Sequence, residues 1–238
     1  EEVNLRLQEK LARIADNEVR WKEYETEDAD LMLVAFGTVG RICQSVVREA
    51  RDKGIKVITW DADVREDARD FFINQAEFEQ IGVYVLRGIA GGLQDFSSSD
   101  KAKVAIVSTT TDSPNQNAWI EAIINEYESK KNDEYSHINL LTDNIVYAGN
   151  DQGTADEKVK ALLNANPDID GIAALSSNTV PAVSSAREQL GIEKDFEIVG
   201  ISVPETSRKD MEQGKMSGVV LWQPFDLGYL TLHVAYDL

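Results

Sequence analysis

Polar and aromatic side chains come at the ends of several apolar runs that the sequence offers as strands. They are Asp61 and Asp63, Asn115 and Gln116, Ser177, and Trp222. The carboxyl ends of parallel strands meet at one edge of a sheet, where ligands bind, so these side chains can converge on one cleft. Carboxylates, amides and hydroxyls hydrogen-bond the hydroxyl groups of a polyhydroxylated ligand, and an aromatic face covers its C–H surface. The set suits a sugar better than a phosphate.

Each of these residues also has a purely structural explanation. Polar residues at strand ends frequently cap helices, and for Ser176 or Asp112 taken singly capping is an equally good explanation. Asp61 and Asp63 gain less from capping, but a metal site built on them would lack His or further acids nearby, so no metal is expected. Core packing is an equal alternative for the tryptophans near strand ends, which are Trp60, Trp119 and Trp222.

Motifs of known catalytic centres are missing from the sequence. It contains no G-x-S-x-G and no G-x-x-x-x-G-K-[ST], and His137 and His233 are far from any candidate nucleophile, so no catalytic residue and no cofactor are expected. The stretch Gly37 to Gly40 follows a predicted strand, and Asp61 comes about 20 residues later, as in a dinucleotide-binding turn. A nucleotide-dependent α/β enzyme therefore stays open as a distant alternative.

Apolar runs and amphipathic stretches alternate along the chain. The predicted strands cover residues 31–36, 57–60, 71–74, 104–108, 138–146, 171–175, 196–201 and 219–222, and the predicted helices cover residues 3–24, 39–53, 77–89, 115–130, 156–165, 181–190 and 225–237. Such alternation predicts an α/β fold with doubly wound parallel sheets. The looser stretch 91–102 divides the chain into a first lobe of residues 1–95 plus 223–238 and a second lobe of residues 102–222. This division into two lobes predicts a cleft between them.

The charge balance excludes some partners. The 238 residues carry a formal net charge of −18, with 42 acids against 24 bases, which disfavours nucleic acid and anionic membranes. No stretch approaches the ~18 consecutive apolar residues of a spanning helix. The opening EEVNLRLQEKLARIADNEV is not a signal peptide, so we expect a chain expressed in the cytoplasm.

Four stretches resemble one branch of a known family. They read VITWDADVREDARDFFINQAEFEQIG, KAKVAIVSTTTDSPNQNAWIEAI, PDIDGIAALSSNTVPAVSSA and VVLWQPFDLGYLTLHVA. From about residue 57 to residue 238 the chain is similar to the rhamnose- and autoinducer-binding branch of the type I periplasmic sugar-binding proteins. The resemblance implies a two-lobed periplasmic solute-binding protein that closes over a rhamnose-like sugar or a related furanosyl signal and docks on an ABC-transporter permease.

The same resemblance implies a role for each candidate residue. Asp61 and Asp63 would be cleft carboxylates, Asn115 and Gln116 would be donors and acceptors from the second lobe, Leu175 and Ser177 would offer backbone groups, and Trp222 would supply a flat surface. Within the branch the position of Asn115 can be an acid, which leaves the ligand open.

The first 57 residues resemble a different family. The stretch from Glu1 to Val57 is similar to part of the α-subunit of a 2-oxoacid:ferredoxin oxidoreductase, outside the segments that hold its cofactors. Two families that meet between Gly54 and Val57 suggest an engineered chimera with a truncated and rebuilt first lobe. We therefore expect, as alternatives, a folded chimera with an incomplete cleft that binds no ligand, and a homodimer formed through an exposed sheet edge.

Overall fold

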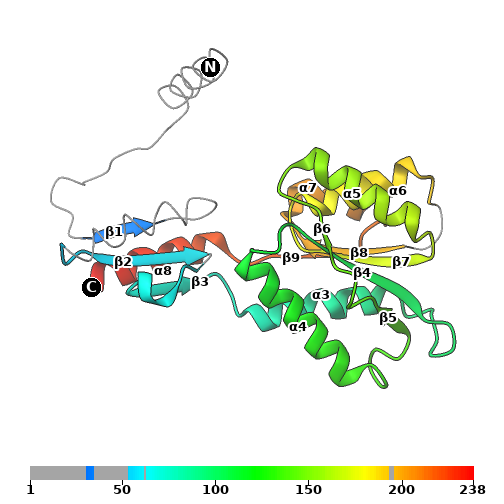
Figure 1. Ribbon diagram of the computed structural model, residues 1–238, viewed down its shortest axis with the longest axis horizontal. Helices are drawn as coiled ribbons and strands as arrows, with labels where there is room; N and C mark the ends of the chain where they lie inside the picture. The colour runs from blue at the N-terminus through cyan, green and yellow to red at the C-terminus, as the bar shows by residue number, and fades with distance from the viewer. Residues whose placement is uncertain (1–30, 35–52, 62, 193–195) are drawn as a thin grey trace, which may run out of the picture.

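The computed structural model describes residues 31–34, 53–61, 63–192 and 196–238, the first of these ranges by its backbone alone (Figure 1). The helices predicted over residues 3–24 and 39–53, and the stretch Gly37 to Gly40, lie outside the described residues. Within them the architecture is α/β with two parallel sheets, as predicted.

The smaller sheet forms the first of two units. Its strands β1 (Leu31–Val34), β2 (Lys56–Asp61) and β3 (Phe71–Asn74) are parallel and lie in the order β1-β2-β3. A short 3₁₀ helix, Glu66–Ala68, lies between β2 and β3. The last helix, α8 (Pro224–Asp237), returns to this sheet and packs on β2 and β3, where Ile58, Ile73 and Ala235 form a small core.

The larger sheet forms the second unit. Its strands are β4 (Ala102–Ser108), β5 (Ile138–Leu140), β6 (Val146–Tyr147), β7 (Ile169–Ala174), β8 (Glu197–Ile201) and β9 (Gly218–Val220). They are parallel in the order β5-β4-β7-β8-β9, and β6 also pairs with β4. The central strands read as continuous apolar runs because helices cover both faces of the sheet.

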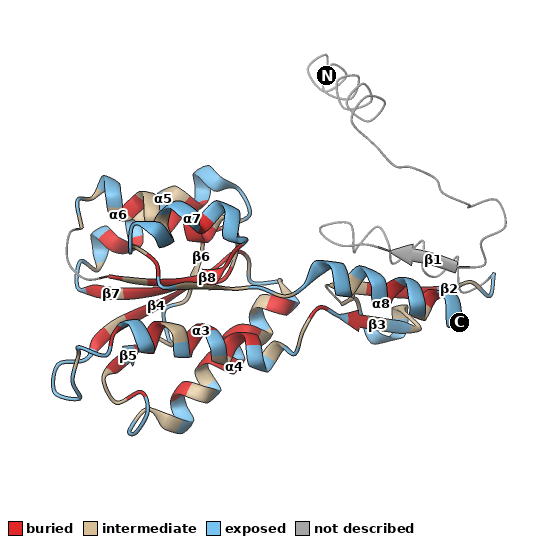
Figure 2. Ribbon diagram, turned by 180° about the vertical axis from the view of Figure 1, so that it is seen from behind, coloured by how far each residue is buried: buried red, intermediate tan, exposed pale blue. Residues whose placement is uncertain are grey.

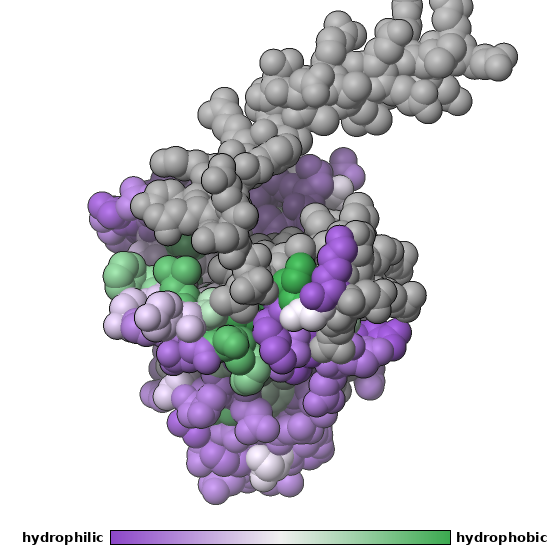
Figure 3. Space-filling view, turned by 90° about the vertical axis from the view of Figure 1, so that its left-hand side faces the viewer, coloured by the Kyte–Doolittle hydropathy of each residue, from purple (hydrophilic) through white to green (hydrophobic). Residues whose placement is uncertain are grey.

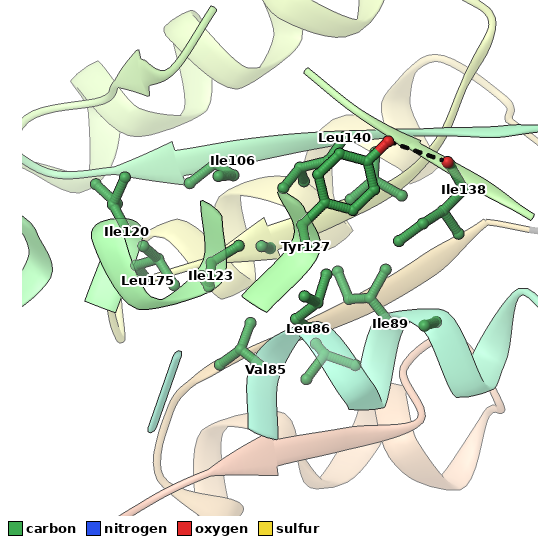
Figure 4. Packing of buried hydrophobic residues seen from close by; sticks show 14 of the residues in the cluster. Val85, Leu86, Ile89, Ile106, Ile120, Ile123, Tyr127, Ile138, Leu140 and Leu175 are labelled. Atoms are coloured by element: carbon green, nitrogen blue, oxygen red, sulfur yellow. Dashed lines mark hydrogen bonds between the residues drawn. The ribbon is translucent and has the colours of Figure 1, made fainter. Parts of the chain in front are cut away.

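Helices form one layer on each face of the larger sheet (Figure 1). One layer contains α3 (Phe78–Gly92) and α4 (Pro114–Lys130), and the other contains α5 (Gln152–Ala165), α6 (Thr179–Gln189) and α7 (Pro204–Glu212). Figure 4 shows the core under α3 and α4, in which Leu86, Ile123 and Ile106 pack together and the hydroxyl of Tyr127 donates to the carbonyl oxygen of Ile138 at 3.3 Å.

The structure corrects the predicted junction between the lobes. We predicted it near residues 91–102, which placed the helix after β3 in the first lobe. Instead, α3 packs against α4, β7, β8 and β9, and its residues Ile81, Val85 and Ile89 belong to the core of the second unit. The chain therefore crosses between the units at residues 75–77 and again at residues 221–223. Helix α7 was not predicted, and the strand predicted over residues 138–146 is divided into β5 and β6.

Candidate ligand-binding site at the junction

Asp61 and Asn115 meet where the two units adjoin. Asp61 ends β2 with a positive φ of 66°, a left-handed conformation that aspartate tolerates better than most residues. Asn115 lies in the first turn of α4, and its Nδ2 donates to the main-chain oxygen of Asp61 at 3.0 Å. Figure 1 shows the end of β2 directed toward the start of α4. Two of the predicted site residues are thus brought together from different units.

Both side chains keep polar atoms that a ligand could use. Asn115 is 8% exposed, and its Oδ1 is buried with no hydrogen-bond partner among the described residues. Burial raises the pKa of the Asp61 carboxyl, which means that the ionised form lacks the hydration it has in water. An unpaired buried acceptor and a partly desolvated carboxylate both favour hydrogen bonds from a ligand hydroxyl.

The carboxylate of Asp63 is hydrogen-bonded by other residues of the first unit. Its two oxygens accept hydrogen bonds of 2.8 and 2.7 Å from Nε and Nη2 of Arg69, a bidentate pair, and the backbone N–H of Val64 donates to it at 2.9 Å. The hydrogen bond with Asp63 raises the pKa of the Arg69 guanidinium, which also lies over the ring of Phe72 at 5.7 Å. The carboxylate therefore organises the loop between β2 and β3.

Gln116 ties the start of α4 to the end of β4. Its Oε1 accepts hydrogen bonds from the Ser108 hydroxyl at 2.5 Å and from the Thr109 backbone N–H and hydroxyl at 2.8 and 3.0 Å. The acceptor end of this amide is fully used by the protein, so only its Nε2 donor can serve a ligand.

The loop after β7 is structured by its own hydrogen bonds. Leu175 is completely buried, and its backbone N–H donates to the Val107 carbonyl oxygen at 2.8 Å, so its carbonyl is the group left for a ligand. The Ser176 hydroxyl accepts from the backbone N–H of Thr179, the first residue of α6, at 3.2 Å, so this serine holds the start of the helix, although the N-cap residue itself is Asn178. Ser177 is exposed at the turn.

Aromatic residues pack at the crossing between the units. Trp119 is 4% exposed, and its ring lies 5.9 Å from that of Trp222 and 6.5 Å from that of Phe78. Core packing is therefore the role of Trp119, and Trp222 lies half-buried against the same core. Trp60 packs partly buried against the core of the first unit.

Sequence reasoning missed Gln75 on the first crossing segment. Its side chain is 8% exposed, and both its Oε1 and its Nε2 are buried without a partner among the described residues, as is Nε1 of Trp119. The available signal was a polar amide directly after the strand FFIN, at the same kind of strand end that produced the other candidates.

Other features of the described residues are separate from this junction. An open pocket of about 400 Å³ lies in the second unit and contains none of the candidate residues; its lining is Ser184, Arg187, Glu188, Gly191, Ile192 and Lys215. No group of three His, Cys, Asp or Glu side chains is placed to hold a metal ion in the part of the chain that the structure describes. Within that same part, no helix has the length and apolar character needed to cross a membrane.

Comparisons with known proteins find two kinds of relative, which match very different shares of the chain. Over 57 residues, 24% of the chain, it is 51% identical to the ketoisovalerate oxidoreductase subunit VorB of Methanothermobacter thermautotrophicus, of which it covers only 16%. An ABC-transporter solute-binding protein from Clostridium phytofermentas with bound L-rhamnose has a TM-score of 0.72 at 22% identity, over 97% of this chain and 67% of that one. LsrB from Clostridium saccharobutylicum, solved with AI-2, has a TM-score of 0.75 at 20% identity, over 96% and 67%.

At such identities the two solved structures show the fold alone. The family of periplasmic binding protein domains matches residues 26–238, which is most of the chain and includes both sheets. The chain belongs to the periplasmic binding protein domain family.

Proposed function

We propose that the chain is the solute-binding protein of an ABC transporter and binds a small polyhydroxylated solute between its two units. The observation that carries this proposal is the meeting of Asp61 and Asn115 across the junction, at the carboxyl end of β2 and the start of α4. Ligands of open parallel sheets bind at such strand ends, and a site built from two units can close around its ligand.

The chemistry of the junction favours a neutral ligand rich in hydroxyl groups. Asp61 and the Oδ1 of Asn115 accept hydrogen bonds from ligand hydroxyls, and the Nε2 of Gln116 donates one. The carbonyl of Leu175 and the exposed hydroxyl of Ser177 add polar groups from the loop after β7. Trp222, half-buried on the second crossing segment, offers the flat face that covers sugar C–H groups.

We infer a rhamnose-like sugar or a related furanosyl signal as the ligand class. Support comes from the bound molecules of the two structural relatives, L-rhamnose in one and AI-2 in the other. A periplasmic location and a permease partner belong to the same proposal. Asp63 contributes by holding the loop after β2 through Arg69, and a direct contact of its carboxylate with the ligand stays a prediction.

A second candidate function is a folded chimera whose cleft no longer binds its ligand. Its support is the 57-residue match to an oxidoreductase subunit, together with the internal hydrogen bonds that occupy Asp63 and the acceptor of Gln116. Losing two or three hydrogen bonds to the ligand, each worth roughly 0.5–1.5 kcal/mol, would weaken binding by about 10- to 1000-fold.

Calorimetric titration of the full chain with L-rhamnose and a panel of related sugars tests both candidates. We expect saturable heat with one sugar, and its loss in Asp61→Ala and Asn115→Ala. Asn117→Ala is the matched control, because Asn117 lies in the same turn of α4 but is exposed and donates to the Thr111 carbonyl instead. No heat from a wild-type chain that unfolds cooperatively would favour the chimera without ligand binding.

A further inference from the structure

Four buried polar atoms beside the junction lack a hydrogen-bond partner. Among the described residues, the buried side-chain nitrogens and oxygens of this kind are Oε1 and Nε2 of Gln75, Oδ1 of Asn115 and Nε1 of Trp119. All three residues are more than nine-tenths buried. They come from the first crossing segment and from the beginning of α4, and we call them the amide–indole cluster.

Unpaired polar atoms destabilise the interior of a protein. At the surface, water pairs polar groups, and Figure 3, which views the molecule from the end where the first unit lies, shows hydrophilic residues over much of the described surface. In the interior, an unmet donor or acceptor loses its hydration without compensation, so nearly all buried polar groups are paired in native structures. Exceptions are expected at functional sites, where stability is given up for binding.

Two members of the cluster lie on one face of α4. Asn115 and Trp119 are four residues apart in the sequence, which places them one helical turn apart, about 6 Å along the helix axis. Figure 2 shows buried residues in the part of α4 that lies toward the first unit. Asn115 is also a residue of the candidate site, so the cluster adjoins that site directly.

The first crossing segment runs along the same turn of α4. Gln75 directly follows Asn74, which pairs with Asp61 in the sheet, and the Asp61 oxygen accepts the hydrogen bond from α4. Three residues after Gln75, the ring of Phe78 lies 6.5 Å from that of Trp119. Three residues of extended chain span at most about 10 Å, so the segment that carries Gln75 stays beside this turn.

The cluster contains donors and acceptors but no charge. The N–H groups of Gln75 and Trp119 donate, and the oxygens of Gln75 and Asn115 accept. A hydroxyl group does both at once, so each ligand hydroxyl here pairs one donor and one acceptor. A carboxylate or a phosphate dianion cannot donate to the two oxygens, and none of the three residues supplies a positive charge to balance it. The chemistry of the cluster therefore selects neutral hydroxyl groups.

We propose that the amide–indole cluster binds the most deeply buried hydroxyl group of the ligand, and that Gln75 and Trp119 thereby determine which sugars the protein accepts. The inference rests on the proposed function, because the ligand must bind at the junction to reach the cluster. It adds to the site the amide of Gln75 and the indole N–H of Trp119, whose ring packs in the core. A site built to hydrogen-bond a hydroxyl group strongly rejects an analogue that lacks it.

Calorimetric titration of the full chain tests this specificity. The probes are L-rhamnose, or the panel sugar that the wild type binds, and its analogues that each lack one hydroxyl group. We expect one analogue to bind the wild type about 100-fold more weakly than the parent sugar, because it leaves a buried donor and a buried acceptor unpaired. Gln75→Met keeps the length of the side chain and removes the amide. It should bind the parent sugar at least about tenfold more weakly, and its preference for the parent over that analogue should fall below about tenfold.

Two further variants complete the titration. Trp119→Phe keeps an aromatic ring in the core and removes the N–H donor, so it should weaken binding of the parent sugar by about tenfold. Gln80→Met is the matched control, because Gln80 is exposed on α3. This variant should keep both the affinity and the discrimination of the wild type.

Urea unfolding without ligand distinguishes a binding role from a structural one. The amide of Gln75 has no partner among the described residues, so Gln75→Met should not lower the urea midpoint. A lowered midpoint with unchanged sugar affinity would assign the amide to the fold and overturn the proposal, as would unchanged discrimination in Gln75→Met. A wild type that binds no sugar of the panel would overturn the proposed function itself, and this inference with it.

Discussion

The side-chain amide of Asn115 donates a hydrogen bond of 3.0 Å to the main-chain oxygen of Asp61, and this bond joins the two units of the molecule. Asp61 is the last residue of β2, paired with Asn74 of β3, and its left-handed backbone ends the strand. Asn115 therefore uses its donor to hold the junction, while its Oδ1 is buried with no hydrogen-bond partner among the described residues.

Replacing Asn115 with Asp should destabilise the protein. The new carboxylate has no donor to offer the Asp61 carbonyl, and it is desolvated because position 115 is 8% exposed. An unmet buried hydrogen bond costs about 1–3 kcal/mol of the free energy of unfolding, and more when the group is charged. Urea unfolding measures the change. Asn117→Asp, whose amide is exposed, should stay within about 0.5 kcal/mol of wild type; equal losses in both variants would show that the junction bond contributes nothing.

Replacing Asp61 with Asn should change how stability depends on pH. Burial raises the pKa of the Asp61 carboxyl above its ordinary value of 3.8. The folded protein thus binds this proton more tightly than the unfolded chain, so the stability contributed by the group is complete below pH 3.8 and is lost as the pH rises through the raised pKa. Asparagine at position 61 does not ionise, so the variant does not lose this stability as the pH rises. Asparagine also tolerates the left-handed backbone.

Melting temperatures of Asp61→Asn and wild type, measured from neutral pH down to below pH 3.8, check this expectation. The variant should be the more stable at neutral pH, and its advantage should disappear on acidification. Asp112→Asn controls for the general effect of removing one negative charge. A variant less stable than wild type at neutral pH would mean that the carboxylate has a stabilising partner.

Replacing Gln116 with Met should loosen the turn between β4 and α4. The thioether cannot accept the three hydrogen bonds that Ser108 and Thr109 donate, and the backbone N–H of Thr109 is left without its partner. We expect a loss of about 1–3 kcal/mol in the free energy of unfolding, measured with urea. Gln189→Met is the control, since Gln189 is exposed on α6. If both variants are equally stable, the three hydrogen bonds to Gln116 contribute nothing to the free energy of unfolding.

The periodicity of apolar residues in the sequence predicted the positions of most helices and strands, because most of these elements bury apolar side chains along one face. The helix of α4 was predicted to within one residue, since it buries Trp119, Ile120, Ile123 and Tyr127 at helical spacing. The strand FFIN was predicted to the residue from its apolar run, although Ile73 is its one buried residue. Helix α7 was missed because Ser207 is its one buried residue, so it presents no apolar period. The pattern of α3 predicted a helix, but an apolar stripe does not specify which sheet it covers, and the junction was therefore misplaced.

The sequence predicted which residues lie in the candidate site better than it predicted which residues they hydrogen-bond. The strand-end rule located Asp61 and Asn115, and the structure brings them together. It did not reveal that Asp63 pairs with Arg69 six residues later. Such pairings depend on side-chain rotamers and on the path of the loop, which residue types and spacing do not encode. The same reason explains why Gln75 was overlooked.

The contact between α3 and α4 gives the sharpest test of the corrected junction. A Cβ at Gly82 would lie 2.6 Å from the Trp119 carbonyl oxygen and 2.7 Å from the Cβ of Ala122, so Gly82→Ala must push the two helices apart. Overpacking of this kind costs about 1–3 kcal/mol, although alanine is otherwise the better helix former. A Cβ at Gly91, in the same helix, would meet nothing within 4 Å, so Gly91→Ala should be neutral or slightly stabilising.

Urea unfolding of the two variants separates packing from helix propensity, because the same substitution is made in one helix. Gly82→Ala should lower the free energy of unfolding and Gly91→Ala should not. If α3 belonged to the first unit, as its place in the sequence suggested, position 82 would have no α4 to meet, and both alanines would stabilise the helix alike. A destabilised Gly82→Ala beside a stable Gly91→Ala therefore assigns α3 to the second unit in solution.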